Sequence, residues 1–199
     1  MRRPGNPAGA DALAVENGRM NDVETATGGV AGRLSFRPLQ AADLPMLHGW
    51  LARPHWTQWW GPAPTLAEVQ ADYGAWIADP SQVQPHIALL DGKPFAYIQS
   101  YVAMGSGGGW WEAETDPGVR GIDQSIADAT QLGRGLGTAM VQAFVARLLA
   151  DPQVTRIQTD PDPRNARAIR CYEKAGFRAV GEVRTPDGTA LLMVCERAA

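Results

Sequence analysis

A glycine-rich segment that runs directly into a helical pattern constrains the fold of this chain more than any other feature. Three glycines alternate with other residues in Gln131-Leu-Gly-Arg-Gly-Leu-Gly137. An apolar stripe at helical spacing then follows, made by Leu136, Met140, Phe144 and Leu148. The first N–H groups of a helix lack intrahelical partners, and the helix dipole favours an anion beside them. The segment therefore indicates either a pyrophosphate-binding loop or an ordinary helix start.

The spacing of these glycines excludes two common phosphate-binding motifs. A P-loop ends in Gly-Lys-Ser/Thr, whereas Gly135-Leu-Gly-Thr138 has no lysine. The dinucleotide-binding pattern Gly-x-Gly-x-x-Gly does not fit glycines spaced by two. The segment instead resembles the acetyl-CoA loop of the GCN5-related N-acetyltransferase (GNAT) superfamily, Gln/Arg-x-x-Gly-x-Gly/Ala. Leu132 stands at the Gln/Arg position, which backbone contacts tolerate because they do not depend on the side chain.

A second segment, residues 165–177, indicates a capped helix. Asn165 is a suitable N-cap, apolar residues including Tyr172 share one face, and Gly176 follows the last turn. An ordinary amphipathic helix has the same features. The pattern Asn-x-x-Ala-x-x-x-Tyr-x-x-x-Gly-Phe is nevertheless similar to a second hallmark of the GNAT superfamily. It follows the glycine loop in the family order, with a strand-like segment (residues 154–159) between them.

An unusual aromatic and acidic segment, residues 110–124, narrows the resemblance. It begins with Trp110-Trp-Glu-Ala-Glu and is similar to the corresponding part of aminoglycoside 6′-N-acetyltransferases of the Ib type. The likeness extends through residues 97–101, 157–161, 168–177 and 185–188. The resemblance implies an α+β GNAT fold: a central mixed, mostly antiparallel β-sheet flanked by helices, with acetyl-CoA in a splay between the central strands. It also implies an enzyme that uses acetyl-CoA as co-substrate to acetylate the 6′-amino group of aminoglycoside antibiotics.

Composition limits the partners and the compartment. A chain of 199 residues suffices for one domain, and a net charge of −3 argues against nucleic acid but suits a cationic small molecule. No apolar run approaches the ~20 residues of a membrane span, and no signal-peptide pattern is present. We therefore expect a cytoplasmic protein, monomeric or homodimeric, with no membrane partner. The histidines and cysteines lack metal-ligand spacing, so no metal is expected; Cys171 and Cys195 fit small buried hydrophobes better than a disulfide or a nucleophile.

The chain divides into a flexible extension (residues 1–32), poor in apolar periodicity, and a GNAT acetyltransferase domain (residues 33–199). Strands are expected at residues 34–39, 86–90, 95–104, 119–123, 154–159, 178–183 and 190–195. Helices are expected at residues 41–51 and 65–78, after the glycine loop, and after Asn165. Residues 56–61, with three tryptophans, are expected in a loop; with Trp110 and Trp111 they line either a core or, as we favour, a ligand cleft.

The resemblance assigns the chemistry to two residues. Asp123, expected at the end of a strand, occupies the position of the general base, and Tyr172 that of the general acid toward the CoA thiolate. A carboxylate with an ordinary pKa near ~4 is poorly matched to an ammonium group. Asp123 is therefore expected to bind the ammonium and take its proton as attack proceeds, directly or through water. Alternatively, Asp123 forms a salt bridge or caps a helix, and Tyr172 is only an aromatic residue of the core.

The remaining candidates fall into a CoA set and a substrate set. Backbone groups of the loop and helix start are the CoA candidates, with Asn165 on the CoA arm and Arg134 either adding charge or lying on the surface: Leu132, Gly133, Arg134, Gly135, Leu136, Gly137, Thr138 and Asn165. Aromatic faces and carboxylates suit a polycationic sugar: Trp60, Trp110, Glu112, Asp116, Asp160 and Asp187, although each acid taken alone also fits a surface charge. Gly108 stands where family members commonly carry Asp, which implies one substrate carboxylate fewer.

Two other functions fit the same motifs. One is an acyl-CoA N-acyltransferase for a lysine-type or siderophore-precursor amine, for which a longer acyl chain is expected. The other is a CoA-binding regulatory module without turnover. The presence of both Asp123 and Tyr172 argues against the regulatory module. A competition between acetyl-CoA and longer acyl-CoAs separates the two enzymes.

Overall fold

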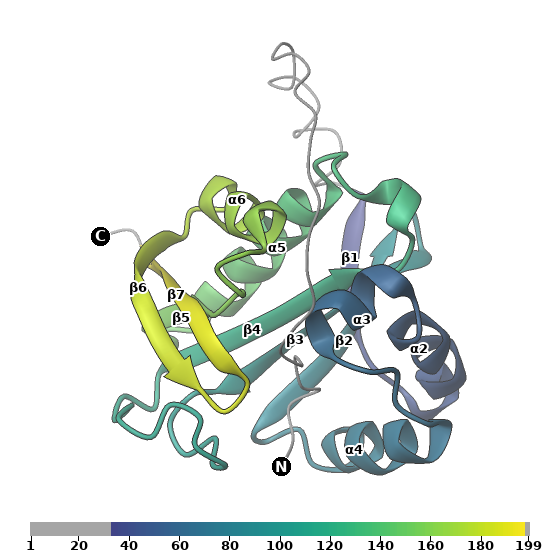
Figure 1. Ribbon diagram of the computed structural model, residues 1–199, viewed down its shortest axis with the longest axis horizontal. Helices are drawn as coiled ribbons and strands as arrows, with labels where there is room; N and C mark the ends of the chain where they lie inside the picture. The colour runs from purple at the N-terminus through teal and green to yellow at the C-terminus, as the bar shows by residue number, and fades with distance from the viewer. Residues whose placement is uncertain (1–32, 198–199) are drawn as a thin grey trace.

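A seven-stranded mixed sheet forms the centre of the protein (Figure 1). The computed structural model describes residues 33–197, and the extension expected over residues 1–32 lies outside the described residues. The strands are β1 (Leu34–Pro38), β2 (Val83–Leu90), β3 (Lys93–Val102), β4 (Val119–Ile126), β5 (Arg156–Thr159), β6 (Arg178–Thr185) and β7 (Gly188–Glu196). Their order across the sheet is β1-β2-β3-β4-β5-β7-β6. Only β4 and β5 pair in parallel, so the expected mixed, mostly antiparallel sheet is confirmed.

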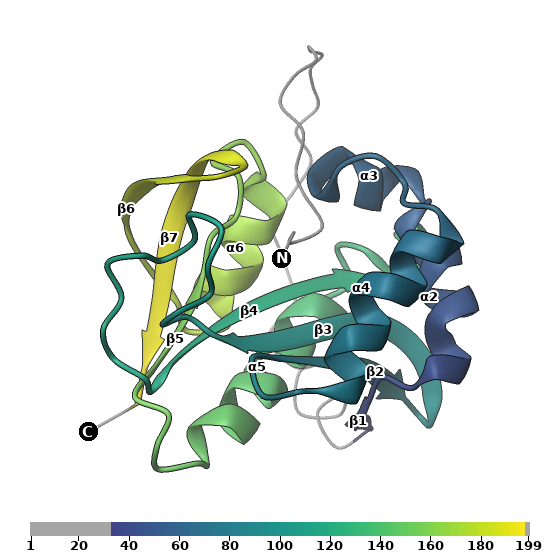
Figure 2. The ribbon, with the colours of Figure 1, turned by 90° about the horizontal axis from the view of Figure 1, so that it is seen from below.

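Helices cover both faces of this sheet (Figure 2). They are α2 (Leu44–Leu51), α3 (Pro54–Trp60), α4 (Leu66–Ala78), α5 (Leu136–Leu149) and α6 (Ala166–Lys174), with 3-10 turns η1 (Ala41–Asp43) and η2 (Ala129–Gln131). The helices α2, α3 and α4 enclose one apolar cluster with the sheet, and α5 and α6 enclose another on the opposite face. No helix within residues 33–197 has the length and apolar character to cross a membrane.

The two clusters follow from the alternation of side chains along the strands. On β3, Ile98 points into the cluster with Met140 and Phe144 of α5, while its neighbour Tyr97 points into the cluster with Trp56 of α3. All five side chains are fully buried. Burial of a large apolar side chain contributes about 1.5–3 kcal/mol, so these layers fix the helices against the sheet.

The sheet opens between β4 and β5. The two strands pair only from Val119 to Gly121 of β4, opposite Arg156 to Gln158 of β5. Strand β4 continues to Ile126, whereas β5 ends at Thr159. Beyond Gly121 the β5-facing edge of β4 therefore has no strand beside it in the described sheet. This is the splay that the family resemblance implies, and it exposes backbone groups to an extended ligand.

The structure corrects several expected boundaries. Residues 56–61 are not a loop: Pro54 occupies the first turn of α3, where proline is tolerated, and the helix ends before Gly61 at φ 95°. The helix expected at residues 41–51 is a 3-10 turn followed by α2, with Pro45 in the first turn. Strand β4 does not end at Asp123 but runs on to Ile126, which places the carboxylate within the strand.

Candidate active site

The glycine loop holds two residues in the left-handed region of backbone conformation. Gly133 has φ 73° and Gly135, the N-cap of α5, has φ 78°. A Cβ at either position would meet no atom within 4 Å, so the backbone conformation and not crowding demands glycine. An L-residue there costs about 1–2 kcal/mol. The loop thus turns sharply into α5 and leaves the first N–H groups of the helix facing outward.

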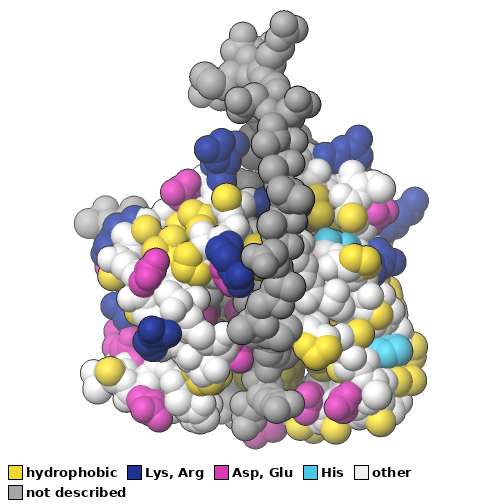
Figure 3. All heavy atoms as spheres, viewed as in Figure 1, with side chains coloured by type: hydrophobic (Ala, Val, Ile, Leu, Met, Phe, Trp, Pro, Cys, Tyr) yellow, Lys and Arg dark blue, Asp and Glu magenta, His cyan; other side chains and the backbone are white. Residues whose placement is uncertain are grey.

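A cavity of about 270 Å³ lies at this turn. Among the predicted CoA-binding residues, those that line it are Leu132, Gly133, Gly135, Gly137, Thr138 and Asn165, whereas Arg134 and Leu136 do not. The cavity is also lined by His55, Arg167, Arg170 and Lys174. Figure 3 shows basic side chains over the α6 region of this face. A helix N-terminus facing three cationic side chains fits the pyrophosphate and the further phosphate of CoA.

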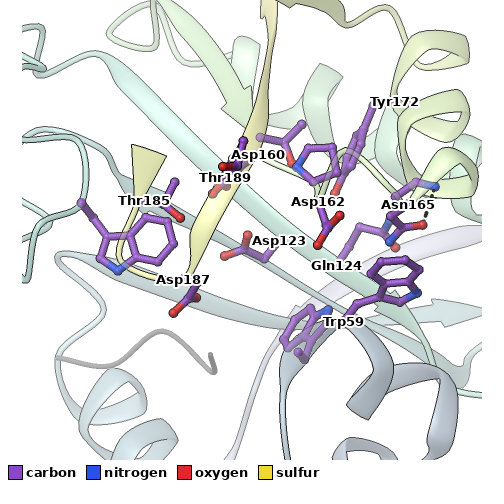
Figure 4. A pocket seen from close by; sticks show the side chains of 16 residues that line it. Trp59, Asp123, Gln124, Asp160, Asp162, Asn165, Tyr172, Thr185, Asp187 and Thr189 are labelled. Atoms are coloured by element: carbon purple, nitrogen blue, oxygen red, sulfur yellow. Dashed lines mark hydrogen bonds between the residues drawn. The ribbon is translucent and has the colours of Figure 1, made fainter. Parts of the chain in front are cut away.

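A second cavity of about 130 Å³ adjoins the first. The two share the lining residues Trp59, Trp60, Gln124, Asn165 and Ala168. Four carboxylates line the second cavity, those of Asp123, Asp160, Asp162 and Asp187, and Figure 4 shows their positions. Among the described residues, no lysine or arginine lines it. A cavity lined by basic side chains therefore adjoins a cavity lined by carboxylates, an arrangement that suits a reaction between an anionic and a cationic molecule.

Strand β4 places Asp123 in the wall of the acidic cavity. Nε2 of Gln99, from the neighbouring strand β3, donates a hydrogen bond of 2.8 Å to its Oδ2. The negative charge of Asp123 also contributes to raising the pKa of Tyr73, Tyr97 and Tyr172, after the larger effect of burial on each. The charge of Asp123 thus acts on three buried phenols.

Helix α6 brings Tyr172 to the same cavity, with 4% of its surface exposed. Burial is the main cause that raises the pKa of this phenol above its ordinary value; hydrogen bonds with Thr159 and Gln124 lower it, and the charge of Asp123 raises it further. The phenol therefore keeps its proton at neutral pH and is a hydrogen-bond donor. At the start of α6, Asn165 caps the helix, because its Oδ1 accepts a 3.1 Å hydrogen bond from the N–H of Ala168.

The tryptophans divide between the core and the cavities. Trp60 and Trp110 line the acidic cavity as expected of substrate-binding residues, together with Trp59. Trp56 is instead fully buried, and its Nε1 donates to the carbonyl of Ile126 at 2.9 Å. Trp111 donates from Nε1 to the hydroxyl of Tyr101 at 3.1 Å and lines neither cavity. The expectation of a tryptophan-lined cleft thus holds for part of the set.

Two predicted substrate residues lie outside both cavities. Asp116 accepts 2.7 Å hydrogen bonds from the N–H of Gly118 and from Oγ1 of Thr155, so it fastens the loop before β4. Glu112 is exposed and lines neither cavity. Asp162, which the sequence analysis missed, does line the acidic cavity and pairs with Arg164 at 2.8 Å. Only its position just after Asp160, beyond the end of β5, signals this role.

Residues 33–197 contain two cysteines, and their thiols are not paired with each other. Cys171 and Cys195 are free and half-buried, and burial raises the pKa of both thiols. Neither thiol therefore forms a reactive thiolate readily. Within this part of the chain, no three His, Cys, Asp or Glu side chains form a group that could hold a metal ion.

Comparison with known proteins shows the family to which the chain belongs. Residues 40–185 match the model of the acetyltransferase (GNAT) domain, and the chain belongs to this family. It is 57% identical over 169 residues to Aminoglycoside N(6′)-acetyltransferase type 1 of Klebsiella pneumoniae, covering 83% of this chain and 84% of that protein. A solved structure of AAC(6′)-Ib with coenzyme A and kanamycin has a TM-score of 0.79 at 57% identity, covering 82% of this chain and 95% of that one. Lysine N-acyltransferase MbtK of Mycolicibacterium paratuberculosis is 31% identical over 159 residues, which cover 74% of this chain and 66% of that protein.

Gly137 offers a test of the CoA site that separates binding from folding. A Cβ there would meet Sγ of Cys171 at 3.4 Å and Cδ1 of Ile126 at 3.6 Å, which are ordinary contacts. Gly137→Ala is therefore expected to keep or raise stability by about 0.5–1 kcal/mol, as alanine does in helices. If CoA approaches this backbone closely, the KM for acetyl-CoA rises about tenfold, or ~1.4 kcal/mol.

The measurement pairs thermal unfolding with acetyl-CoA kinetics, and Gly74→Ala in α4 is the matched control. A Cβ at Gly74 would meet nothing within 4 Å, and Gly74 lines neither cavity. We expect the control to gain similar stability without a change in KM. An unchanged KM in Gly137→Ala would show that CoA does not approach this part of the loop.

Proposed function

We propose that this protein is an acetyl-CoA-dependent N-acetyltransferase that modifies the 6′-amino group of aminoglycosides and thereby confers resistance to them. The observation that carries the proposal is the meeting of a glycine-loop cavity rich in basic side chains with an acidic cavity that contains Asp123 and Tyr172. The 57% identity to an aminoglycoside N(6′)-acetyltransferase supports the choice of substrate. Because acetyl-CoA is a cytoplasmic metabolite, the reaction is assigned to the cytoplasm, and one chain supplies both cavities whether it acts as a monomer or a homodimer.

One candidate catalytic side chain acts on the attacking amine, and the other acts on the departing sulfur of CoA. The acetyl thioester of bound acetyl-CoA supplies the acyl group. Asp123 binds the incoming ammonium and takes one proton from the nitrogen, so that the lone pair is free to attack the thioester carbon. The carbon–sulfur bond breaks as the amide bond forms, and the second proton lost by the nitrogen neutralises the CoA thiolate. Tyr172 donates a hydrogen bond to the departing sulfur. Since burial raises the pKa of Tyr172, and a thiol has an ordinary pKa near ~8.5, the phenol stabilises the thiolate without surrendering its proton fully.

The acidic cavity recognises the rest of a polycationic sugar. Figure 4 shows the carboxylates of Asp160, Asp162 and Asp187 around Asp123. Those of Asp160 and Asp187 attract ammonium groups, whereas that of Asp162 is paired with Arg164. Indole faces of Trp60 and Trp110 provide apolar contact and cation–π attraction. Gly108, at φ 61°, carries no side chain where relatives of the Ib type commonly have Asp, so we expect one ammonium contact fewer.

The test is a measurement of CoA thiol release with acetyl-CoA and a panel of amines. Kanamycin and tobramycin are expected to be acetylated, whereas 6′-hydroxy analogues are not. The absence of turnover with every 6′-amino compound contradicts the proposal. Faster turnover of a lysine-type amine with a long acyl-CoA supports instead an acyltransferase that resembles MbtK.

A further inference from the structure

Three side chains of β3 stand on one face of the sheet and oppose three residues of β4. Tyr97, Gln99 and Tyr101 alternate along β3, which places them on the same face. The strand register sets Gln99 directly opposite Asp123. Gln99 has 2% of its surface exposed, and Tyr97 is fully buried. A polar amide is thus buried beside the candidate base, where it requires hydrogen-bond partners.

The partners of Gln99 fix the direction of its amide. The hydroxyl of Tyr97 donates to Oε1 of Gln99 at 2.5 Å, and Nε2 of Gln99 donates to Oδ2 of Asp123 at 2.8 Å. Burial raises the pKa of Tyr97 well above its ordinary value, so this phenol keeps its proton and acts as the donor. A flipped amide would set its oxygen against the carboxylate. Because the Asp123 carboxylate only accepts, Nε2 of Gln99 must point toward it, and the phenol holds this orientation by donating to the remaining Oε1.

Packing around Tyr97 holds the phenol in place. Its ring centroid lies 5.7 Å from Tyr73 of α4, 6.4 Å from Trp56 and 6.0 Å from Trp60 of α3. Aromatic pairs at these distances attract each other beyond the effect of area burial. Trp60 also lines the acidic cavity, so the cluster that fixes Tyr97 continues into the substrate wall.

We propose that Gln99 is a positioning residue that orients the Asp123 carboxylate toward the substrate amine, with Tyr97 holding the Gln99 amide through its Oε1. The proposal rests on the proposed function, in which Asp123 accepts the proton. With Oδ2 held by Gln99, the plane of the carboxylate is fixed when an ammonium enters. Such support matters because a misplacement of about 1 Å can cost ~10²-fold in rate.

The test uses Gln99→Met and Tyr97→Phe, with Gln158→Met as the matched control. Gln158 is as buried as Gln99, but its Nε2 has no hydrogen-bond partner within the described part of the chain. We expect Gln99→Met to lower kcat for kanamycin by about 10- to 100-fold and Tyr97→Phe by less, with KM for both substrates nearly unchanged. Gln158→Met is expected to keep its kcat. Thermal unfolding of all three variants identifies any that do not fold. Because Tyr97→Phe retains the aromatic ring, it tests separately the hydrogen bond from Tyr97 to Gln99.

Combining Gln99→Met with Asp123→Asn distinguishes a positioning role of Gln99 from a purely structural role. If Gln99 acts through Asp123, then Gln99→Met lowers kcat in the wild type but not in Asp123→Asn. Equal losses in both backgrounds, or an unchanged kcat in Gln99→Met, would overturn the inference. Turnover of kanamycin by the unaltered enzyme is measured first and tests the proposed function alone, so the two failures are distinguishable.

Discussion

Asp123→Asn is expected to lower kcat for kanamycin acetylation by about 10²- to 10⁴-fold, the contribution typical of a general base. Asparagine keeps the size of the side chain but has little affinity for a proton and no charge to bind an ammonium. The carboxylate lies in the wall of the acidic cavity and accepts a hydrogen bond from Gln99, so its replacement removes the proton acceptor with little change in shape. Steady-state kinetics at saturating acetyl-CoA measure the loss.

The control for this prediction is Asp187→Asn in the same cavity. Its carboxylate is assigned to substrate binding, so we expect a higher KM for the aminoglycoside and a kcat close to that of the wild type. Calorimetric titration with CoA is expected to give the wild-type affinity for both variants. If Asp123→Asn retained its kcat and only raised KM, Asp123 would be one more ammonium ligand and the base would be another group.

Tyr172→Phe is expected to lower kcat by about 10²-fold, the loss seen when one preorganised donor is removed from a developing negative charge. Tyr172 is buried at the acidic cavity, and its raised pKa keeps the phenol protonated while sulfur departs. Phenylalanine retains the ring packing against Phe177, whose centroid lies 5.4 Å away. The KM for acetyl-CoA is therefore expected to change little.

Tyr73→Phe is the matched control, because the buried hydroxyl of Tyr73 has no hydrogen-bond partner among residues 33–197. Its removal is expected to leave kcat unchanged and stability equal or higher. Since the pKa of Tyr172 is raised, its deprotonation produces no basic limb in the kcat profile up to about pH 10, the ordinary value for tyrosine. A basic limb below pH 9 that disappears in Tyr172→Phe would contradict the assigned role.

The features that sequence reasoning predicted well depend on neighbours within one or two turns. The capping box of α4 is formed, with the N–H of Glu68 donating to Oγ1 of Thr65 at 3.3 Å. Asn165 caps α6, and Gly176 follows that helix at φ 98°. Gly133 and Gly135 precede α5 as expected, whereas Gly137 lies in the first turn of the helix. Each signal is local, so no knowledge of the tertiary structure is needed to interpret it.

The features that sequence reasoning missed depend on contacts across the fold. The tryptophan-rich segment forms α3 because Trp56 fits the core beneath it, a preference that its loop-like composition does not show. Asp116 is held by Thr155, 39 residues further along the chain. Gln99 and Asp123, 24 residues apart, meet through strand register alone. The splay between β4 and β5 came from family resemblance, since no local pattern marks where two parallel strands separate.

The position of the new amide on kanamycin tests the central claim most directly. Kanamycin is incubated with the enzyme and acetyl-CoA, and the product is purified and assigned by NMR. Our account predicts a single acetyl group on the 6′ nitrogen, because the proposed function places that amine beside Asp123 and Tyr172 in the acidic cavity that both residues line. An acetyl group on any other amine, or unmodified kanamycin after complete incubation, would contradict it.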